Sequence, residues 1–293
     1  MSARVEASPY PIELQDRVDA YLAGLRFAPE PAAARLEEAM RYSLLAGGKR
    51  IRPVLSLATA HALGRSPDDV LPLAGTIEMI HTYSLIHDDL PAMDDDNLRR
   101  GKPTCHVAFG EDVAILAGDG LFAEALRLSL TDQAGEPEHV LAAVREVVTA
   151  AGVGGMVGGQ FLDVAGDRSV DVRHLHELKT GALVAASVGA VLSLEGLRPP
   201  ATIPYRRFAA ELGVVFQIVD DILDVTGDEA ELGKPRGTDE RHGKATYVSV
   251  FGLERARELA RYSHGKAREA LAQAEGDTAL LGQIADYILT RPT

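Results

Sequence analysis

Apolar residues recur at intervals of three and four along most of the chain, a spacing that places them on one face of a helix. Leu14, Val18, Leu22 and Leu25 illustrate the pattern in the first such segment. No long alternation of apolar and polar residues, typical of a strand, is present. The pattern therefore predicts an all-α protein, with helices over about 12–25, 32–45, 71–87, 113–130, 137–151, 170–194, 204–225, 246–274 and 280–290.

Two glycine-rich segments interrupt these helices. The glycine pair at 47–48 ends the second helix, and Pro53 suits the first turn of another helix. Lys49 and Arg52 therefore lie where a helix begins, a position that favours anions. The second segment, GVGGMVGGQFLD at 152–163, has enough glycines to break a helix. We expect these glycines to permit close helix packing or the close approach of a ligand.

The remaining sequence shows no division into parts. No linker, low-complexity tract or fixed-period repeat occurs, so residues 1–293 are predicted to form a single domain. A long, charged, glycine-rich stretch at 226–243 predicts a binding loop or lid, or else a disordered segment. Arg291, close to the C-terminus, is expected at a frayed end, with a place in the ligand site as the alternative.

The segment 81–100, HTYSLIHDDLPAMDDDNLRR, has an unusual density of acids that follows the end of an apolar helix. Carboxylates packed so closely repel one another, so they are stable when solvated or neutralised by bound cations. Alone, this array is equally compatible with a solvated acidic loop. Its members are Asp88, Asp89, Asp94, Asp95 and Asp96, followed by Arg99 and Arg100.

A second acidic array lies on an otherwise apolar helix. Gln217, Asp220, Asp221 and Asp224 are spaced i, i+3, i+4, i+7, so they share one face. Carboxylates on such a helix face a cavity or a metal more often than plain water. Oxygen ligands without His or Cys indicate Mg²⁺, with Mn²⁺ as the alternative. The two arrays together predict a metal-bridged phosphate site.

The charge balance limits the partners. Asp and Glu number 43 against 30 Lys and Arg, and the net charge of −13 argues against nucleic acid and anionic membrane surfaces. The longest apolar run, 181–194, is shorter than the roughly 20 residues of a membrane span, so it is predicted to form a buried helix. With Cys105 as its only cysteine, the chain is compatible with a reducing cytoplasm. An acidic protein that binds phosphates needs metals or focused cations, for which the candidates are Lys49, Arg52, Arg99, Arg100, Lys179, Lys234 and Lys244.

Six motifs in order resemble the trans-prenyltransferases, the polyprenyl diphosphate synthase family. The four residues between Asp89 and Asp94 are similar to the bacterial short-chain subgroup, which makes farnesyl or geranylgeranyl diphosphate. The resemblance implies a helical bundle around a deep central cavity, usually as a homodimer. The motifs are GGKRIRP (47–53), HDDLPAMDDDNLRRG (87–101), GGMVGGQFLD (154–163), KTGAL (179–183), FQIVDDILD (216–224) and GKPRGTD (233–239).

The resemblance also implies a role for individual residues. Asp88 and Asp94 would bind metal, with Asp89 and Asp95 supporting them, and the second motif would contribute its three aspartates. Lys179, Thr180 and Gln217 are the residues expected to act in catalysis. The isopentenyl diphosphate site would comprise Lys49, Arg52, His81 and Arg100, and the allylic diphosphate site Arg99, Lys179, Thr180, Gln217, Lys234 and Lys244.

The reaction that this family performs needs no protein nucleophile, and the sequence offers no convincing nucleophile–base pair. Mg²⁺ would polarise the allylic diphosphate as a Lewis acid, and the double bond of isopentenyl diphosphate would attack the allylic cation. The resemblance implies that the helix before the first array carries the cavity floor, which limits the length of the product. Tyr83 lies there, five residues before Asp88, or about 7.5 Å along the helix. A bulky ring at this position resembles the family members that make the C15 product, farnesyl diphosphate, with the C20 product as the alternative.

Three other classes explain less of the sequence. A His-Asp metal phosphohydrolase could use His61, His81 and His87, but it leaves the second array unexplained. Terpene cyclases share the fold but generally replace the second aspartate motif, which is intact here. A catalytically inactive regulatory subunit would usually have lost aspartates, and both motifs keep theirs.

Overall fold

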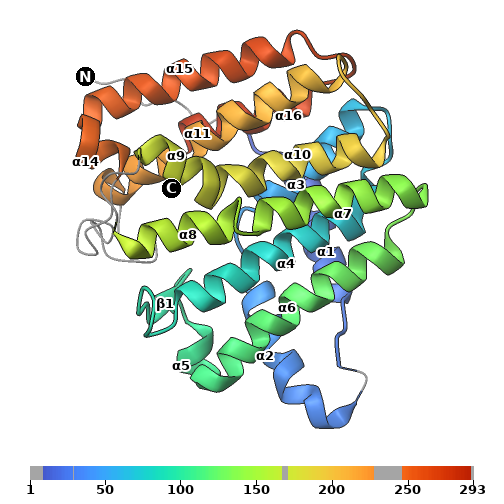
Figure 1. The fold of residues 1–293 in the computed structure, drawn as a ribbon, viewed down its shortest axis with the longest axis vertical. Coiled ribbons are helices and arrows are strands. Elements are labelled where there is room, and N and C mark those ends of the chain that lie inside the picture. Colours follow the sequence, from blue (N-terminus) through green and yellow to red (C-terminus); the bar gives the residue numbers. More distant parts are fainter. Residues whose placement is uncertain (1–8, 29, 167–170, 228–245, 292–293) are drawn as a thin grey trace.

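The fold is a bundle of helices with one very short hairpin (Figure 1). The computed structural model describes residues 9–28, 30–166, 171–227 and 246–291. The all-α prediction is confirmed. The α-helices are α1 Ile12–Gly24, α2 Ala34–Leu44, α3 Ile51–Ala62, α4 Leu71–Asp88, α5 Cys105–Phe109, α6 Glu111–Asp132, α7 Pro137–Ala151, α8 Met156–Ala165, α9 Val172–His176, α10 Ala182–Leu194, α11 Thr202–Thr226, α14 Tyr247–Phe251, α15 Leu253–Leu271 and α16 Ala279–Thr290. Shorter elements are the 3₁₀ turns Pro31–Ala33 and Pro67–Val70, the π-helical turn η3 Glu177–Gly181, and the antiparallel strands β1 Leu98–Arg99 and β2 Lys102–Pro103.

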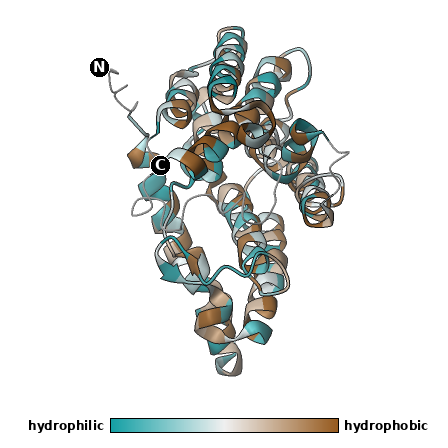
Figure 2. Ribbon diagram, turned by 90° about the vertical axis from the view of Figure 1, so that its left-hand side faces the viewer, coloured by the Kyte–Doolittle hydropathy of each residue, from teal (hydrophilic) through white to brown (hydrophobic). Residues whose placement is uncertain are grey.

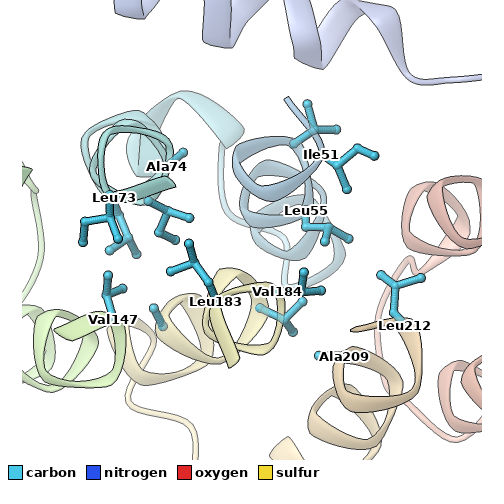
Figure 3. Packing of buried hydrophobic residues seen from close by; sticks show 14 of the residues in the cluster. Ile51, Leu55, Leu73, Ala74, Val147, Leu183, Val184, Ala209 and Leu212 are labelled. Atoms are coloured by element: carbon cyan, nitrogen blue, oxygen red, sulfur yellow. The ribbon is translucent and has the colours of Figure 1, made fainter. Parts of the chain in front are cut away.

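The core lies where α3, α4, α7, α10 and α11 meet (Figure 3). Leu183 and Val184 of α10 point into this region, where Leu55 of α3 and Leu73 of α4 also lie. Each of these four side chains is at most 1% exposed. Burial of one Leu or Val contributes about 1.5–3 kcal/mol, so the apolar faces that predicted these helices also hold them together.

Helix α10 confirms the prediction that segment 181–194 forms a buried helix. Two helical stretches, Pro137–Ala165 and Val172–Leu194, are long and apolar enough to cross a membrane by length and composition alone. Core helices of soluble proteins pass the same criterion. In this fold α10 packs against α3, α7 and α11.

Several boundaries differ from those predicted. The glycine-rich segment does form a helix, α8, from Met156 onward, and the loop after α4 contains the β1–β2 hairpin and α5. The predicted helix over 246–274 is divided into α14 and α15 at Gly252, whose φ of 81° lies in the left-handed region. Hydropathic periodicity does not register such short interruptions, because the apolar spacing resumes on either side.

Hydrophilic and hydrophobic residues alternate along most helices, so the ribbons change colour along their length (Figure 2). Both predicted aspartate arrays lie at helix ends, one at the end of α4 and the other near the end of α11. The core therefore holds these two ends in place, and the carboxylates of Asp89, Asp221 and Asp224 are themselves buried.

Candidate active site

The first aspartate array begins where α4 ends. Asp88 is the last residue of α4, and Asp89 is its C-cap. The chain then folds back, because the backbone N–H of Asp94 donates to the carbonyl oxygen of Asp88 at 2.9 Å. The Nε2 of Gln160, from α8, donates to a carboxylate oxygen of Asp88 at 2.8 Å. This turn brings Asp94 to the helix end that carries Asp88.

Asp89 forms a forked ion pair with Arg99. The Nε of Arg99 lies 2.8 and 2.9 Å from the two carboxylate oxygens, and Asp89 is only 3% exposed. Burial raises the pKa of Asp89, and the bonds from Arg99 oppose that rise. Arg99 was predicted to bind the allylic diphosphate, yet here it neutralises a buried aspartate and connects the hairpin to the end of α4.

The second array is organised by a chain of hydrogen bonds. The hydroxyl of Thr180 donates to Gln217 at 2.9 Å, and the amide of Gln217 donates to Asp221 at 2.7 Å. The backbone N–H of Tyr247 donates to the other oxygen of Asp221 at 2.7 Å. Asp221 and Asp224 are both buried. Thr180 from one predicted motif and Gln217 and Asp221 from another therefore lie in one network.

Asp220 has a different environment from Asp221. Its side chain is 44% exposed, and it accepts a hydrogen bond from the guanidinium of Arg291. Arg291 itself is only 8% exposed, and its guanidinium carbon lies 4.6 Å from the centre of the Phe216 ring. The expectation of a frayed end at Arg291 was wrong, because the residue is held by an ion pair and by an aromatic face.

A cationic cavity of about 520 Å³ lies beside Asp220. Burial lowers the pKa of Arg52, although its guanidinium stays charged, and its Nε has no hydrogen-bond acceptor among the described residues. A buried donor without an acceptor is costly, so this cavity is suited to an anion. The lining residues include Lys49, Arg52, His81, Arg100, Phe216, Asp220 and Arg291.

Arg100 reaches this cavity across a glycine. Its backbone is left-handed, with φ 53°, and its guanidinium donates to the carbonyl oxygen of Gly47. A Cβ on Gly48 would lie 2.6 Å from the Arg100 guanidinium carbon. Gly48 is therefore required for Arg100 to lie over the loop that carries Lys49, which explains one glycine of the GGKRIRP motif.

Arg50 and His81 complete the surroundings of this cavity. Arg50 is buried and binds Glu78 at 2.6 Å and Asp19 at 2.8 Å, so it ties α4 and α1 to the start of α3. Burial, together with the positive field of Arg52 and Arg100, holds the pKa of His81 well below its usual value. His81 is therefore neutral at pH 7 in the absence of ligand.

A second cavity, of about 410 Å³, is mostly apolar. Tyr83 lies in its wall, and its ring packs against Phe122 with centroids 5.2 Å apart. Burial raises the pKa of the Tyr83 phenol, which keeps it neutral. The apolar part of the lining consists of Tyr83, Leu85, Met93, Met156, Val157, Phe161 and Val164.

Lys179 and Thr180 enter this apolar cavity from the π-helical turn η3. Single π turns inside helices are frequent at functional sites. The Nζ of Lys179 lies 2.5 Å from Asp163 of α8. Gly159 makes this approach possible, because a Cβ there would lie 2.3 Å from the backbone nitrogen of Lys179. The expectation that the glycine-rich segment permits close helix packing is confirmed at this position.

The two cavities share two residues, Arg52 and His81, so polar and apolar compartments meet there. Asp88 borders the apolar cavity, and Asp220 borders the cationic one. Lys234 and Lys244 lie outside the described residues, as does almost all of the predicted lid at 226–243.

The oxygen donors at these helix ends suit a hard divalent cation. Within the described part of the chain, no three Asp, Glu, His or Cys side chains already converge on one point. Mg²⁺ does not require such a cage, because it retains several waters and takes one or two carboxylates together with substrate phosphates. Asp220 already holds a cationic group, the Arg291 guanidinium, so a positive charge fits at this position.

Sequence reasoning missed several residues of the site. Gln160 and Asp163 fall within a motif that was noted for its glycines, and their polar side chains on an apolar helix were the available signal. Phe216 lies in the second aspartate motif, but its contact with Arg291 joins residues that are 75 positions apart in the sequence. No local pattern indicates such a contact.

Comparison with known proteins agrees with this geometry. A profile described as polyprenyl synthetase matches residues 33–287. The chain is 46% identical over 264 residues to farnesyl diphosphate synthase of Geobacillus stearothermophilus, covering 88% of this chain and 89% of that protein. It is 47% identical over 266 residues to the chloroplastic geranylgeranyl pyrophosphate synthase of Capsicum annuum, covering 87% and 71% respectively. A geranyltransferase of Helicobacter pylori, solved with magnesium and isoprenyl diphosphate, aligns with a TM-score of 0.84 at 32% identity, covering 95% and 94%.

The chain belongs to the polyprenyl synthetase family. Within that family it is a trans-prenyltransferase of the farnesyl or geranylgeranyl diphosphate synthase type. The family depends on magnesium, which agrees with the hard oxygen donors at the ends of α4 and α11. The names of the relatives are divided between the two products, so product length has to be argued from the cavity.

Proposed function

We propose that this enzyme condenses isopentenyl diphosphate with dimethylallyl or geranyl diphosphate and that its main product is farnesyl diphosphate. The observation that carries the proposal is the junction of the two cavities at Arg52 and His81. A diphosphate requires cations, and a growing hydrocarbon chain requires apolar walls. A junction between the two kinds of surface lets one substrate use both at once.

The cationic cavity is proposed to hold isopentenyl diphosphate. Lys49, Arg52 and Arg100 would bind its phosphate oxygens, because all three line the cavity and Arg52 has a buried N–H that lacks an acceptor. Neutral His81 can donate one further hydrogen bond without adding charge. This arrangement directs the isopentenyl double bond toward the shared wall and the apolar cavity.

The allylic diphosphate is proposed to lie between the two aspartate arrays. Magnesium, or manganese, held by Asp88, Asp94, Asp220 and Asp224 would supply Lewis-acid stabilisation of the leaving diphosphate. Asp89 and Asp221 belong to the same predicted metal set, and their hydrogen bonds to Arg99 and Gln217 give each carboxylate a fixed orientation.

Lys179, Thr180 and Gln217 are proposed to complete the allylic site. Lys179 and Thr180 lie at the wall of the apolar cavity, and Thr180 is hydrogen-bonded to Gln217. Lys179 would contact the departing oxygens, while Thr180 and Gln217 orient the reacting carbon. Lys234, Lys244 and Arg99 are predicted to contribute to the same diphosphate.

The chemistry follows from this placement. The allylic C–O bond breaks, the isopentenyl double bond supplies two electrons to the resulting cation, and a new C–C bond forms. A proton is then lost from the adjacent carbon to the departed diphosphate. Buried Met156 lines the cavity and would keep water away from the cation. No protein nucleophile takes part.

Product length is proposed to depend on Tyr83. Its ring projects into the cavity wall and is supported from behind by Phe122. Two aromatic rings packed edge to face resist displacement by a growing chain, which favours the C15 product. The C20 product remains the second candidate, because relatives at 44–47% identity are named geranylgeranyl synthases.

We further propose that a single catalytic domain acts as a homodimer in the cytoplasm. One continuous apolar cluster, with residues from Leu14 to Ile288, supports the single domain. Ile115 and Leu116 of α6 are 44% and 55% exposed, and a second copy of the chain would remove this apolar area from water. Sedimentation equilibrium tests this directly: a mass near 31.3 kDa would contradict a dimer.

The activity is tested by incubating the purified protein with isopentenyl and dimethylallyl diphosphates and Mg²⁺ and then identifying the products after phosphatase treatment. Farnesol is the expected alcohol, and EDTA is expected to abolish its formation. Absence of any chain-elongated product would contradict the proposal, and geranylgeraniol as the main alcohol would select the C20 alternative. This outcome also separates an active enzyme from an inactive subunit or a phosphohydrolase.

A further inference from the structure

Arg291 reaches the second aspartate array from the C-terminal end of the chain. It follows α16, which packs against α11 and α15 (Figure 1). Its guanidinium binds Asp220 and lies over the ring of Phe216. The same ring lies 5.6 Å from the guanidinium carbon of Arg52. Phe216 therefore provides an aromatic surface for two arginines of one cavity.

The bond between Arg291 and Asp220 competes with the proposed role of Asp220. A carboxylate that accepts from a guanidinium has that lobe occupied, and a metal ion at the same oxygen would place two positive groups side by side. The side chain of Asp220 is 44% exposed, whereas that of Arg291 is 6% exposed. A metal can thus approach Asp220 from solvent while Arg291 stays inside the cavity.

Two features of Arg291 would keep its guanidinium in the cavity after the bond to Asp220 is broken. Its Nε is buried and has no acceptor among the described residues, as is also the case for the Nε of Arg52. Two orphaned donors that line one cavity call for an anion with several oxygens. The attraction of Arg291 to the Phe216 ring does not depend on Asp220 and would hold the guanidinium near that anion.

We propose that Arg291 is an exchangeable counter-cation of Asp220: a divalent metal displaces it, and the released guanidinium then binds the diphosphate in the adjacent cationic cavity. The inference rests on the proposed function of the two cavities. It couples metal binding at the second aspartate array to isopentenyl diphosphate binding. Because such coupling is reciprocal, each ligand must raise the affinity for the other by the same factor.

The substitution Arg291→Gln separates the two effects. Without the competing guanidinium, Asp220 is free for metal, so Mn²⁺ alone should bind about two- to fivefold more tightly, in line with a partly exposed ion pair. Isopentenyl diphosphate should lose affinity only when metal is present. The coupling factor, about fivefold or more in the wild type, should fall close to one.

The measurements are free Mn²⁺ by electron paramagnetic resonance, and isopentenyl diphosphate binding by calorimetry in EDTA and in saturating Mg²⁺. A protein-free titration corrects for the Mg²⁺–diphosphate complex in solution. Arg257→Gln, at an exposed arginine that pairs with Glu254 on α15, is the matched control and should behave as the wild type. Arg291→Lys keeps the charge and should retain part of the coupling.

The outcomes distinguish the exchange from the function on which it rests. If the wild type binds metal and diphosphate but Arg291→Gln leaves both the Mn²⁺ affinity and the coupling factor unchanged, the exchange is contradicted and the proposed function stands. If the wild type binds neither ligand, both are contradicted. Far-UV circular dichroism of each variant confirms that the helices are intact.

Discussion

The ring of Tyr83 meets that of Phe122 at a centroid distance of 5.2 Å, in an edge-on arrangement. It also meets the imidazole ring of His87, at a centroid distance of 5.8 Å. The phenol is neutral because burial raises its pKa, so it presents an uncharged, bulky barrier to a hydrocarbon chain. Tyr83 comes from α4 and Phe122 from α6, so the barrier is only as firm as the packing of those two helices.

Removal of this ring should lengthen the product. Tyr83→Ala is expected to shift the main product from C15 to C20, since the methyl group no longer fills the end of the cavity. Phe122 still limits growth, so the double variant with Phe122→Ala should extend the chain further. The alcohols released by phosphatase report the distribution. Tyr262→Ala, at a tyrosine that is 62% exposed, is the control, and an unchanged distribution in Tyr83→Ala would remove Tyr83 as the length determinant.

His81 should give the ligand-free protein a measurable dependence of stability on pH. Its pKa is held well below 6.5 by burial and by nearby arginines, so the unfolded chain takes up the proton first as the pH falls. The free energy of unfolding is therefore unaffected by protonation of His81 above about pH 6.5. Below that pH it decreases by about 1.4 kcal/mol for each pH unit, until the pH reaches the pKa of His81 in the folded protein. Stability should fall between pH 7.5 and 5.5.

Urea unfolding at the two pH values tests this. The stability difference between the wild type and His81→Gln should shrink by about 1 kcal/mol at pH 5.5, because the variant has no imidazole to protonate. His174→Gln, at an exposed position, controls for the loss of a histidine as such. A difference that stays constant with pH would show that the environment of His81 does not depress its pKa.

At the level of elements, the contact between α8 and η3 sets the position of Lys179. Gly159 lies against the backbone of Lys179, so the two segments approach more closely than any side chain would permit. The π turn then directs Lys179 and Thr180 into the cavity wall. The close approach of α8 and η3 therefore determines where Lys179 and Thr180 lie in the cavity wall.

Gly159→Ala should lower both stability and turnover. Its Cβ would lie 2.3 Å from a backbone nitrogen and 2.6 Å from a Cα, neither of which can rotate away, so a cost of about 1–3 kcal/mol is expected. Gly154→Ala, in the same glycine-rich motif, meets nothing within 4 Å and should change stability by less than about 0.5 kcal/mol. Equal effects of the two substitutions in urea unfolding would contradict this account.

The helices were largely predictable because their apolar faces pack on one core. The pattern placed α7 at its observed bounds and α11 within two residues at its start and one at its end. The β1–β2 hairpin, α5 and η3 were not predictable in this way. Each is too short to show periodicity, and each is held by contacts such as the pairing of Arg99 with Asp89 across ten residues.

The candidate site divides in the same manner. The aspartates, Lys49, Arg52 and Gln217 stood out because polar residues on apolar helices or in dense clusters need an explanation. The partners that orient them, including Arg291, Phe216 and Tyr247, are brought in by tertiary packing. The sequence could therefore indicate which residues are candidates for ligand binding. It could not indicate which of these residues form hydrogen bonds or ion pairs with one another in the ligand-free protein.

At the scale of the whole molecule, an acidic protein can bind two polyanionic substrates because its cationic side chains are separated in space from its aspartate arrays. The cations gather in one cavity, where Arg52, Arg100 and Arg291 lie close together, while the two aspartate arrays stand at the ends of α4 and α11. Under the proposed function, metal ions would supply the remaining positive charge between those ends. The central claim is that both helix ends act on one diphosphate through these ions.

Steady-state turnover of Asp88→Ala and Asp220→Ala at saturating Mg²⁺ tests this claim most directly. Each should fall by about a hundredfold or more with the helical content unchanged, because each removes one side of the same metal site. Asp68→Ala, at an exposed aspartate that pairs with Arg17, should keep wild-type turnover. Near-normal turnover in either site variant would contradict the assignment of the two arrays to one metal-held diphosphate.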